Sequence, residues 1–181
     1  GSVRELQAKD IVIATGSEPT PLPGVTIDNK RILDSTGALA LPTVPKHLVV
    51  IGAGVIGLEL GSVWRRLGSE VTVVEYLDRI CPGLDDETAK TLQRTLSKQG
   101  MRFKLATKVS AAKATTKGVT LDLQPAAGGE VEQLQADYVL VAIGRRPYTV
   151  GLGLETVGLA TDKSGMLENQ QHRSSVPGIW I

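Results

Sequence analysis

Three glycines, followed at a distance by one acidic residue, form the pattern in this sequence best suited to chemistry. Gly52, Gly54 and Gly57 have the spacing G-x-G-x-x-G, and Glu75 follows about 20 residues later, as the dinucleotide motif requires. In that motif the first glycine permits a tight turn, the second lets a pyrophosphate approach the backbone, and the third lets a helix pack closely on a sheet. The helix N-terminus adds unpaired N–H groups and a positive dipole end. The pattern predicts a dinucleotide site.

Glu75 indicates which nucleotide such a site would prefer. A carboxylate at the tip of the second strand accepts hydrogen bonds from the ribose hydroxyls of NAD. It would repel the 2′-phosphate of NADP by about 4 kcal/mol at a separation of about 4 Å and an effective dielectric constant of about 20. An NADP site usually has an arginine close by, whereas here Asp78 adds a second acid before Arg79. The alternatives are a solvated strand-end acid for Glu75 and a glycine turn without a ligand for the whole motif.

The elements that must position these residues alternate between strands and helices. Apolar and β-branched runs predict parallel strands, and apolar residues at helical spacing predict the helices between them. The predicted succession is a strand at Leu48–Ile51, a helix with Ile56, Leu60, Val63, Trp64 and Leu67 on its buried face, a strand at Glu70–Glu75, a helix capped by Asp85 or Asp86 with Ala89, Leu92 and Leu96 buried, and strands at Met101–Leu105 and Asp137–Ile143. Alternation between Thr107 and Leu134 predicts an antiparallel meander. The fold class is therefore α/β, with a Rossmann-like parallel sheet, helices on its faces and an added β-meander.

Shorter elements are predicted on either side of this core. Those that precede it are a strand at Lys9–Thr15, an extended proline-rich segment at Ser17–Gly24, and a helix at Thr36–Leu41 capped by Asp34 or Ser35. A further strand begins near Ile179. Because the two outer strands lack predicted sheet neighbours, we expect them to pair with each other or with a neighbouring molecule. Gly1–Ser2 resembles the scar of a removed tag, and we expect the chain to be a fragment of a longer protein.

Composition and charge exclude several classes of function. With 20 Lys plus Arg against 19 Asp plus Glu, and with 3% aromatic residues, the chain lacks the basic field and the stacking residues of a nucleic-acid binder. No apolar run approaches the roughly 18 residues of a membrane span. Cys81 is the only cysteine, so an internal disulfide is impossible, and we expect an inert thiol. A protein of a reducing, aqueous compartment is therefore expected.

Several other polar residues have simpler interpretations than catalysis. His47 and His172 are far apart in sequence and lack ligand spacing, so no metal site is expected. The pair Asp85–Asp86 is interpreted as helix capping. Two interpretations stay open for Arg145 and Arg146: contact with a cofactor phosphate or a partner domain, or a solvated surface position.

Four stretches together resemble a known family. They are Thr15–Pro19 (TGSEP), Gly52–Trp64 (GAGVIGLELGSVW), Val74–Glu75 and Ala142–Pro147 (AIGRRP). They are similar to the dihydrolipoamide dehydrogenases of the pyridine nucleotide-disulfide oxidoreductase family, and the resemblance covers essentially the whole chain after its first two residues. Glutathione reductases of the same family, which bind NADP, typically have a tyrosine at the position of Val55.

The resemblance implies a parent protein with an FAD domain, an NAD domain inserted into it, a central segment and a dimerising domain. Residues 1–15 would end the FAD domain, 16–147 would form the NAD domain with its connectors, and 148–181 would begin the central segment. The implied cofactor-binding residues are Thr15, Gly16 and Ser17 toward the flavin nucleotide, and Gly52, Ala53, Gly54, Val55, Ile56, Gly57, Leu58, Glu59, Glu75, Val109 and Gly144 toward NAD. Val55 would stand where the nicotinamide meets the flavin. Glu59 would pair with a lysine of the FAD domain, a simple surface acid being the alternative.

The activity implied by the resemblance is oxidation of dihydrolipoamide through a redox disulfide and FAD, with hydride transfer to NAD⁺. The redox cysteine pair, the flavin's own glycine motif and the catalytic His-Glu pair are not in this sequence. NAD and FAD are therefore the implied cofactors, whereas this chain contains no catalytic residues, and alone it is expected to bind NAD(H) weakly and to be inactive. The implied partners are a second subunit and a 2-oxoacid dehydrogenase complex or glycine cleavage system.

Other functions and the compartment stay open at this point. The chain is alternatively the NAD-binding part of another flavoprotein, such as a soluble transhydrogenase or a mercuric reductase. A non-catalytic module that binds NAD as a sensor or structural ligand is the second class. The compartment would be the cytoplasm of a bacterium or the mitochondrial matrix of a eukaryote, and we expect the cytoplasm.

Overall fold

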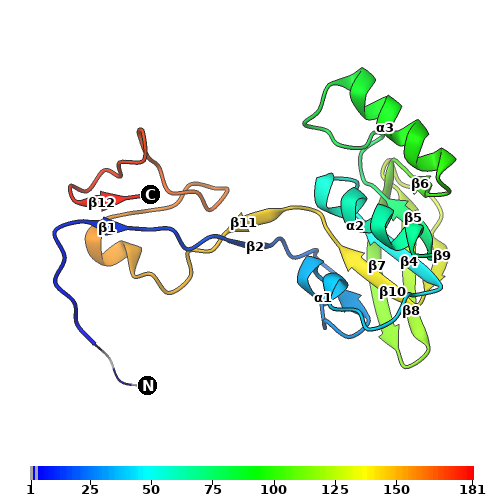
Figure 1. Ribbon diagram of the computed structural model, residues 1–181, viewed down its shortest axis with the longest axis horizontal. Coiled ribbons are helices and arrows are strands. Elements are labelled where there is room, and N and C mark those ends of the chain that lie inside the picture. Colours follow the sequence, from blue (N-terminus) through cyan, green and yellow to red (C-terminus); the bar gives the residue numbers. More distant parts are fainter. Residues whose placement is uncertain (1, 3) are drawn as a thin grey trace. The chain divides into compact units, whose positions relative to one another are not determined.

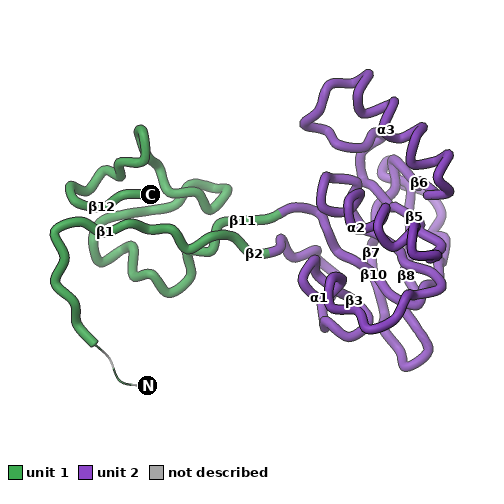
Figure 2. Tube along the Cα trace, in the orientation of Figure 1, with its two compact units in different colours: residues 1–18, 145–181 green, residues 19–144 purple. Residues whose placement is uncertain are grey.

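The computed structural model describes residue 2 and residues 4–181 of the chain. The chain divides into two compact units (Figure 2). Unit 2 comprises residues 19–144, and unit 1 comprises the described residues up to 18 together with residues 145–181. The first residue of the predicted tag scar and Val3, within the predicted end of the FAD domain, lie outside the described residues.

Unit 2 is built on a five-stranded parallel sheet (Figure 1). Its strands lie in the order β3 (Ile32–Leu33), β10 (Tyr138–Val141), β4 (His47–Ile51), β5 (Glu70–Val74) and β6 (Arg102–Lys104). Every neighbouring pair is parallel. The predicted parallel sheet is thus confirmed. The edge strand β3 was not predicted, because two apolar residues give no detectable periodicity.

Helices cover one face of this sheet and an antiparallel meander covers the other. The helices are α1 (Ser35–Leu39), α2 (Val55–Arg66) and α3 (Asp86–Lys98), and the meander strands are β7 (Thr107–Thr115), β8 (Gly118–Pro125) and β9 (Glu132–Ala136). In β4, Leu48 and Val50 belong to the core on the helical side, whereas Val49 and Ile51 belong to the core beneath the meander. Successive side chains of a strand point to opposite faces, so β4 is buried on both. The predicted α/β class with an added meander is confirmed, but the helices cover only one face of the sheet, because the meander covers the other.

The predicted buried face of α2 is wrong in part. Trp64 is buried as predicted, but Val63 and Leu67 are 42% and 56% exposed. The helix also buries Gly57, Leu58 and Gly61, which were not predicted. Two of these are glycines, which a search for large apolar residues overlooks. A Cβ on Gly61 would lie 3.1 Å from the Met101 side chain, so the helix approaches the sheet more closely than bulky side chains would allow.

Asp85 caps α3, as predicted. Its carboxylate accepts a hydrogen bond from the Thr88 N–H at 3.0 Å, and this bond holds the pKa of Asp85 below its usual value. A group with a lowered folded-state pKa adds stability above its unfolded pKa and loses it as the pH falls through the folded value. We therefore expect Asp85→Ala to lower the urea midpoint at pH 7, with the difference from wild type shrinking below about pH 4. A difference that persists unchanged at pH 2 would contradict this role.

Two small two-stranded sheets are formed by the described residues of unit 1, except that β2 ends one residue into unit 2. One pairs β1 (Ile11–Val12) in parallel with β12 (Ile179–Trp180), and the other pairs β2 (Ser17–Pro19) with β11 (Arg145–Pro147). The expectation that the two outer strands pair with each other is confirmed, but the predicted strand at Lys9–Thr15 is only two residues long. No helix within residues 2 and 4–181 is long and apolar enough to cross a membrane.

The two arginines of β11 are bound to β2. Arg145 donates to the Ser17 hydroxyl at 2.8 Å and to the Ser17 carbonyl. Arg146 forms an ion pair with Glu18 at 2.8 Å. Both arginines are exposed and also make specific contacts inside unit 1.

Candidate dinucleotide-binding site

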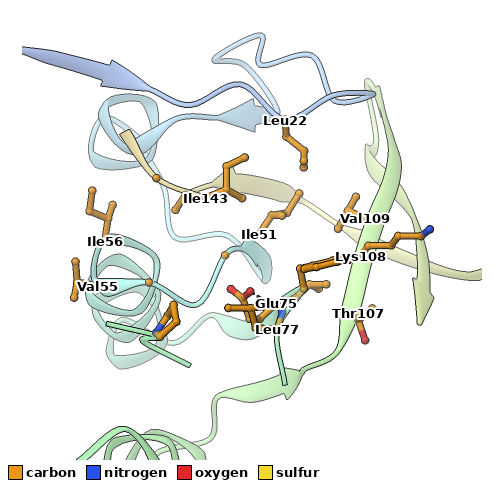
Figure 3. A pocket seen from close by; sticks show the side chains of 17 residues that line it. Leu22, Ile51, Val55, Ile56, Glu75, Leu77, Thr107, Lys108, Val109 and Ile143 are labelled. Atoms are coloured by element: carbon orange, nitrogen blue, oxygen red, sulfur yellow. Dashed lines mark hydrogen bonds between the residues drawn. The ribbon is translucent and has the colours of Figure 1, made fainter. Parts of the chain in front are cut away.

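A cavity of about 470 Å³ lies at the carboxyl ends of the central parallel strands of unit 2 (Figure 3). Its wall is formed where β4, β5 and β10 end and by the start of β7. The lining residues are Leu22, Ile51, Gly52, Gly54, Val55, Ile56, Val74, Glu75, Tyr76, Leu77, Pro82, Thr107, Lys108, Val109, Ala142, Ile143 and Gly144. Open α/β sheets bind ligands in the crevice outside the carboxyl ends of their strands, so this cavity is in the expected place.

Gly52 and Gly57 are required by the packing of the protein itself. Gly52 has φ +103°, and a Cβ there would lie 2.5 Å from the Ala142 carbonyl oxygen. A Cβ on Gly57 would lie 2.3 Å from the Gly52 carbonyl oxygen and 3.0 Å from the Val50 side chain. Side chains are excluded at both positions, so the turn is tight and the helix lies close to the sheet.

Gly54 is not explained in this way. It is the N-cap of α2 with φ −77°, a conformation that any residue adopts, and a Cβ there would meet no atom within 4 Å. The first N–H groups of a helix have no intrahelical acceptor. Gly54 therefore leaves an open approach to a helix N-terminus at the edge of the cavity, which is what a bound pyrophosphate requires.

Glu75 follows β5 and points into the cavity beside the glycine turn (Figure 3). One carboxylate oxygen accepts the Ala53 N–H at 2.7 Å, and the other accepts the Leu77 N–H at 2.9 Å. An ionised carboxylate has about four acceptor sites, so these two bonds leave capacity for the hydroxyls of a ligand.

The residues implied by the resemblance fall into four groups. Those that line the cavity are Gly52, Gly54, Val55, Ile56, Glu75, Val109 and Gly144. Ala53, Gly57 and Leu58 are buried beneath the turn, and Glu59 is exposed on α2 outside the cavity. Thr15, Gly16 and Ser17 lie in unit 1, where they line a separate cavity of about 350 Å³ with residues of β11.

Comparison with known proteins places the chain in a family. Residues 1–181 match the family described as pyridine nucleotide-disulphide oxidoreductase. The chain belongs to this family. It is 75% identical over 181 residues to dihydrolipoyl dehydrogenase 3 of Pseudomonas aeruginosa, covering 100% of this chain and 39% of that protein. It is 55% identical to the leghemoglobin reductase of Vigna unguiculata, covering 97% of this chain and 34% of that protein.

Two solved structures are similar to this chain in fold. LpdA of Mycobacterium tuberculosis superposes with a TM-score of 0.89 at 31% identity, over 99% of this chain and 38% of that one. The flavoprotein disulfide reductase RclA of Escherichia coli superposes with a TM-score of 0.84 at 30% identity, over 94% of this chain and 38% of that one. The chain thus spans less than two fifths of the length of these relatives. The family implies NAD and FAD as cofactors.

Several residues that line the cavity were not predicted from the sequence. Tyr76 and Leu77 directly follow the acidic residue, and they are 60% and 40% exposed. Leu22 and Ile143 add apolar surface from other segments of unit 2. Two apolar residues directly after the predicted ribose acid were a usable signal for the first pair. No local pattern indicated Leu22, which only the tertiary fold brings to the cavity.

Cys81 is buried in the loop after β5, as part of the core on the helical side of the sheet. Burial raises the pKa of its thiol, so the reactive thiolate is scarce at neutral pH. We expect a thiol-specific disulfide reagent at pH 8 to modify Cys81 at least about tenfold more slowly in the folded chain than in urea. Equal rates in the two states would contradict this burial.

Proposed function

We propose that residues 16–147 form the NAD(H)-binding domain of a flavoprotein oxidoreductase of the dihydrolipoyl dehydrogenase type. Unit 2, residues 19–144, holds the nucleotide cavity of this domain. The observation that carries the proposal is Gly54, which neither the backbone angle nor the packing requires to be glycine. A nucleotide phosphate bound at the α2 N-terminus would explain why position 54 is a glycine, because a side chain there would occupy the phosphate's position.

NAD(H) is the proposed nucleotide because of Glu75. Its carboxylate faces the cavity and retains acceptor capacity for the 2′ and 3′ hydroxyls of the adenosine ribose. The same charge would repel a 2′-phosphate. Tyr76 and Leu77 give an apolar surface beside this position, which suits the adenine ring.

The remaining implied contacts are part of the same proposal. Val55 is 58% exposed at the start of α2, where it would meet the nicotinamide, and the exposed Glu59 would pair with a lysine elsewhere in the parent. Thr15, Gly16 and Ser17, around their own cavity in unit 1, would contact FAD. Residues up to 15 would then end the FAD domain, and residues 148–181 would begin the central segment.

The proposed parent activity is oxidation of dihydrolipoamide with reduction of NAD⁺. FAD and NAD supply the electron and hydride chemistry when bound, and this chain's residues bind and orient them. With Cys81 as its only cysteine, the chain lacks a redox pair, so we propose that it is inactive alone. The parent would act as a homodimer with a 2-oxoacid dehydrogenase complex or glycine cleavage system, in a bacterial cytoplasm.

One comparison bears on the substrate of the parent. A relative of 55% identity is named leghemoglobin reductase, so the similarity of these residues does not determine what the parent reduces or oxidises. The proposal for the NAD(H) domain is the same under either name.

The proposal is tested by titrating the ¹⁵N-labelled 181-residue chain with NADH and following its amide resonances. We expect saturable shifts concentrated at 52–58, 75–77 and 143–144, because these residues surround the cavity. Millimolar NADH that causes no saturable shift, or shifts centred on unit 1 alone, would refute the proposed function.

A further inference from the structure

Two hydrogen bonds from one loop converge on the peptide groups of Ala53, the residue between the first two glycines of the motif. The Ala53 N–H donates to Glu75 Oε2 at 2.7 Å, and the Ala53 carbonyl accepts the Cys81 N–H at 2.9 Å. We propose that Glu75 is a positioning residue for the phosphate-binding turn as well as a ribose ligand. The Glu75 carboxylate and the Cys81 backbone N–H together hold the two peptide groups of Ala53, and this pair of hydrogen bonds is called the clamp below. This inference rests on the proposed nucleotide-binding function.

The geometry of trans peptides explains how this clamp acts. In a planar trans peptide the carbonyl and the N–H of the next residue point in opposite directions. The Cys81 N–H holds the Ala53 carbonyl toward its own loop, so the Gly54 N–H in the same peptide plane points away from that loop. Glu75 likewise orients the preceding plane, in which the Gly52 carbonyl points toward Gly57, since a Cβ on Gly57 would lie 2.3 Å from it. Both planes of the turn are therefore fixed before a ligand arrives.

Glu75 is itself held in place for this task. Its second oxygen accepts the Leu77 N–H at 2.9 Å, and its backbone N–H donates to the Lys104 carbonyl at 2.9 Å. Hydrogen bonds to an ionised acceptor are roughly twice as strong as neutral ones. The Glu75 backbone is thus paired with β6, while its carboxylate bonds the glycine turn and the Leu77 N–H and keeps further acceptor sites for a ribose.

Cys81 contributes through its backbone rather than through thiol chemistry. Its φ of +44° lies in the left-handed region that non-glycine residues rarely adopt. Its buried side chain packs in the core on the helical side, and the Leu84 N–H donates to its carbonyl at 2.9 Å. Core packing and this turn together keep the Cys81 N–H aimed at Ala53.

One consequence concerns cofactor selectivity. A neutral residue at position 75 would remove the repulsion of a 2′-phosphate, but it would also remove the acceptor of the Ala53 N–H. Substitution at position 75 alone is therefore expected to weaken NADH binding without producing comparably tight NADPH binding.

The decisive experiment compares two ligands that differ only in the ribose hydroxyls. ADP and 2′,3′-dideoxyadenosine diphosphate are titrated calorimetrically into the full 181-residue chain as wild type, Glu75→Ala, Glu75→Gln and the control Glu130→Ala. If Glu75 positions the turn, Glu75→Ala lowers the affinity for the dideoxy nucleotide by about tenfold. Glu75→Gln lowers this affinity less, since its amide oxygen can still accept the Ala53 N–H. The control Glu130→Ala leaves the affinity unchanged. A dideoxy nucleotide that binds wild type and Glu75→Ala equally would leave Glu75 as a ribose ligand only and overturn the inference.

A measurement on the free chain separates this inference from the proposed function. Amide hydrogen exchange of Ala53 is expected to be at least about tenfold faster in Glu75→Ala than in wild type or Glu130→Ala. Unchanged exchange in a folded Glu75→Ala chain would overturn the clamp. If the wild-type chain binds neither NADH nor ADP, the proposed function fails, whereas the exchange result still decides whether Glu75 holds the turn.

Discussion

Gly54→Ala is expected to weaken NADH binding at least about 100-fold while changing the free energy of unfolding by less than about 1 kcal/mol. The new methyl group meets no protein atom within 4 Å, so the folded chain has room for it. It instead enters the space from which a pyrophosphate would reach the first N–H groups of α2. Two lost charge-assisted hydrogen bonds of about 1.5–3 kcal/mol each account for the loss of affinity.

Gly83→Ala is the matched control for this substitution. Gly83 also has no atom within 4 Å of its ideal Cβ and no positive φ, and it does not line the cavity. Calorimetry with NADH and urea unfolding should therefore give wild-type values for it. Wild-type NADH affinity in Gly54→Ala would contradict the assignment of this helix end to the pyrophosphate.

Gly57→Ala is expected to act mainly on stability, lowering the free energy of unfolding by about 3 kcal/mol. Its Cβ would lie 2.3 Å from the Gly52 carbonyl oxygen and 3.0 Å from the Val50 side chain. Neither neighbour can yield easily, since one is backbone in a tight turn and the other belongs to the buried core. The helix must move away from the sheet, and the turn moves with it.

Urea denaturation followed by tryptophan fluorescence measures this loss, because Trp64 is buried on the same helix. NADH affinity should also fall in Gly57→Ala, as the displaced turn no longer aims its N–H groups. The two variants should differ in a diagnostic way. Gly54→Ala loses NADH affinity alone, whereas Gly57→Ala loses both stability and NADH affinity. A Gly57→Ala chain as stable as wild type would show that α2 packs less closely than described.

The sequence predicted the parts of this fold that depend on local pattern. Strands β4, β5 and β10, the capped helix α3 and the meander all have strong periodicity or turn signals, and each is found near its predicted position. The buried face of α2 was mispredicted in part, because Gly57 and Gly61 contribute close approach rather than apolar bulk. The site divides in the same way: the glycines and Glu75 were visible as a motif, whereas the bond from Cys81 to Ala53 depends on tertiary structure.

The measurement that tests the central claim most directly is a competition between NADH and NADPH for the 181-residue chain. The two ligands share every group except the 2′-phosphate, so their affinity ratio reports on the charge beside the ribose. The account predicts that NADH binds at least about 100-fold more tightly than NADPH, because the Glu75 carboxylate repels the phosphate. Equal affinities, or a preference for NADPH, would contradict it.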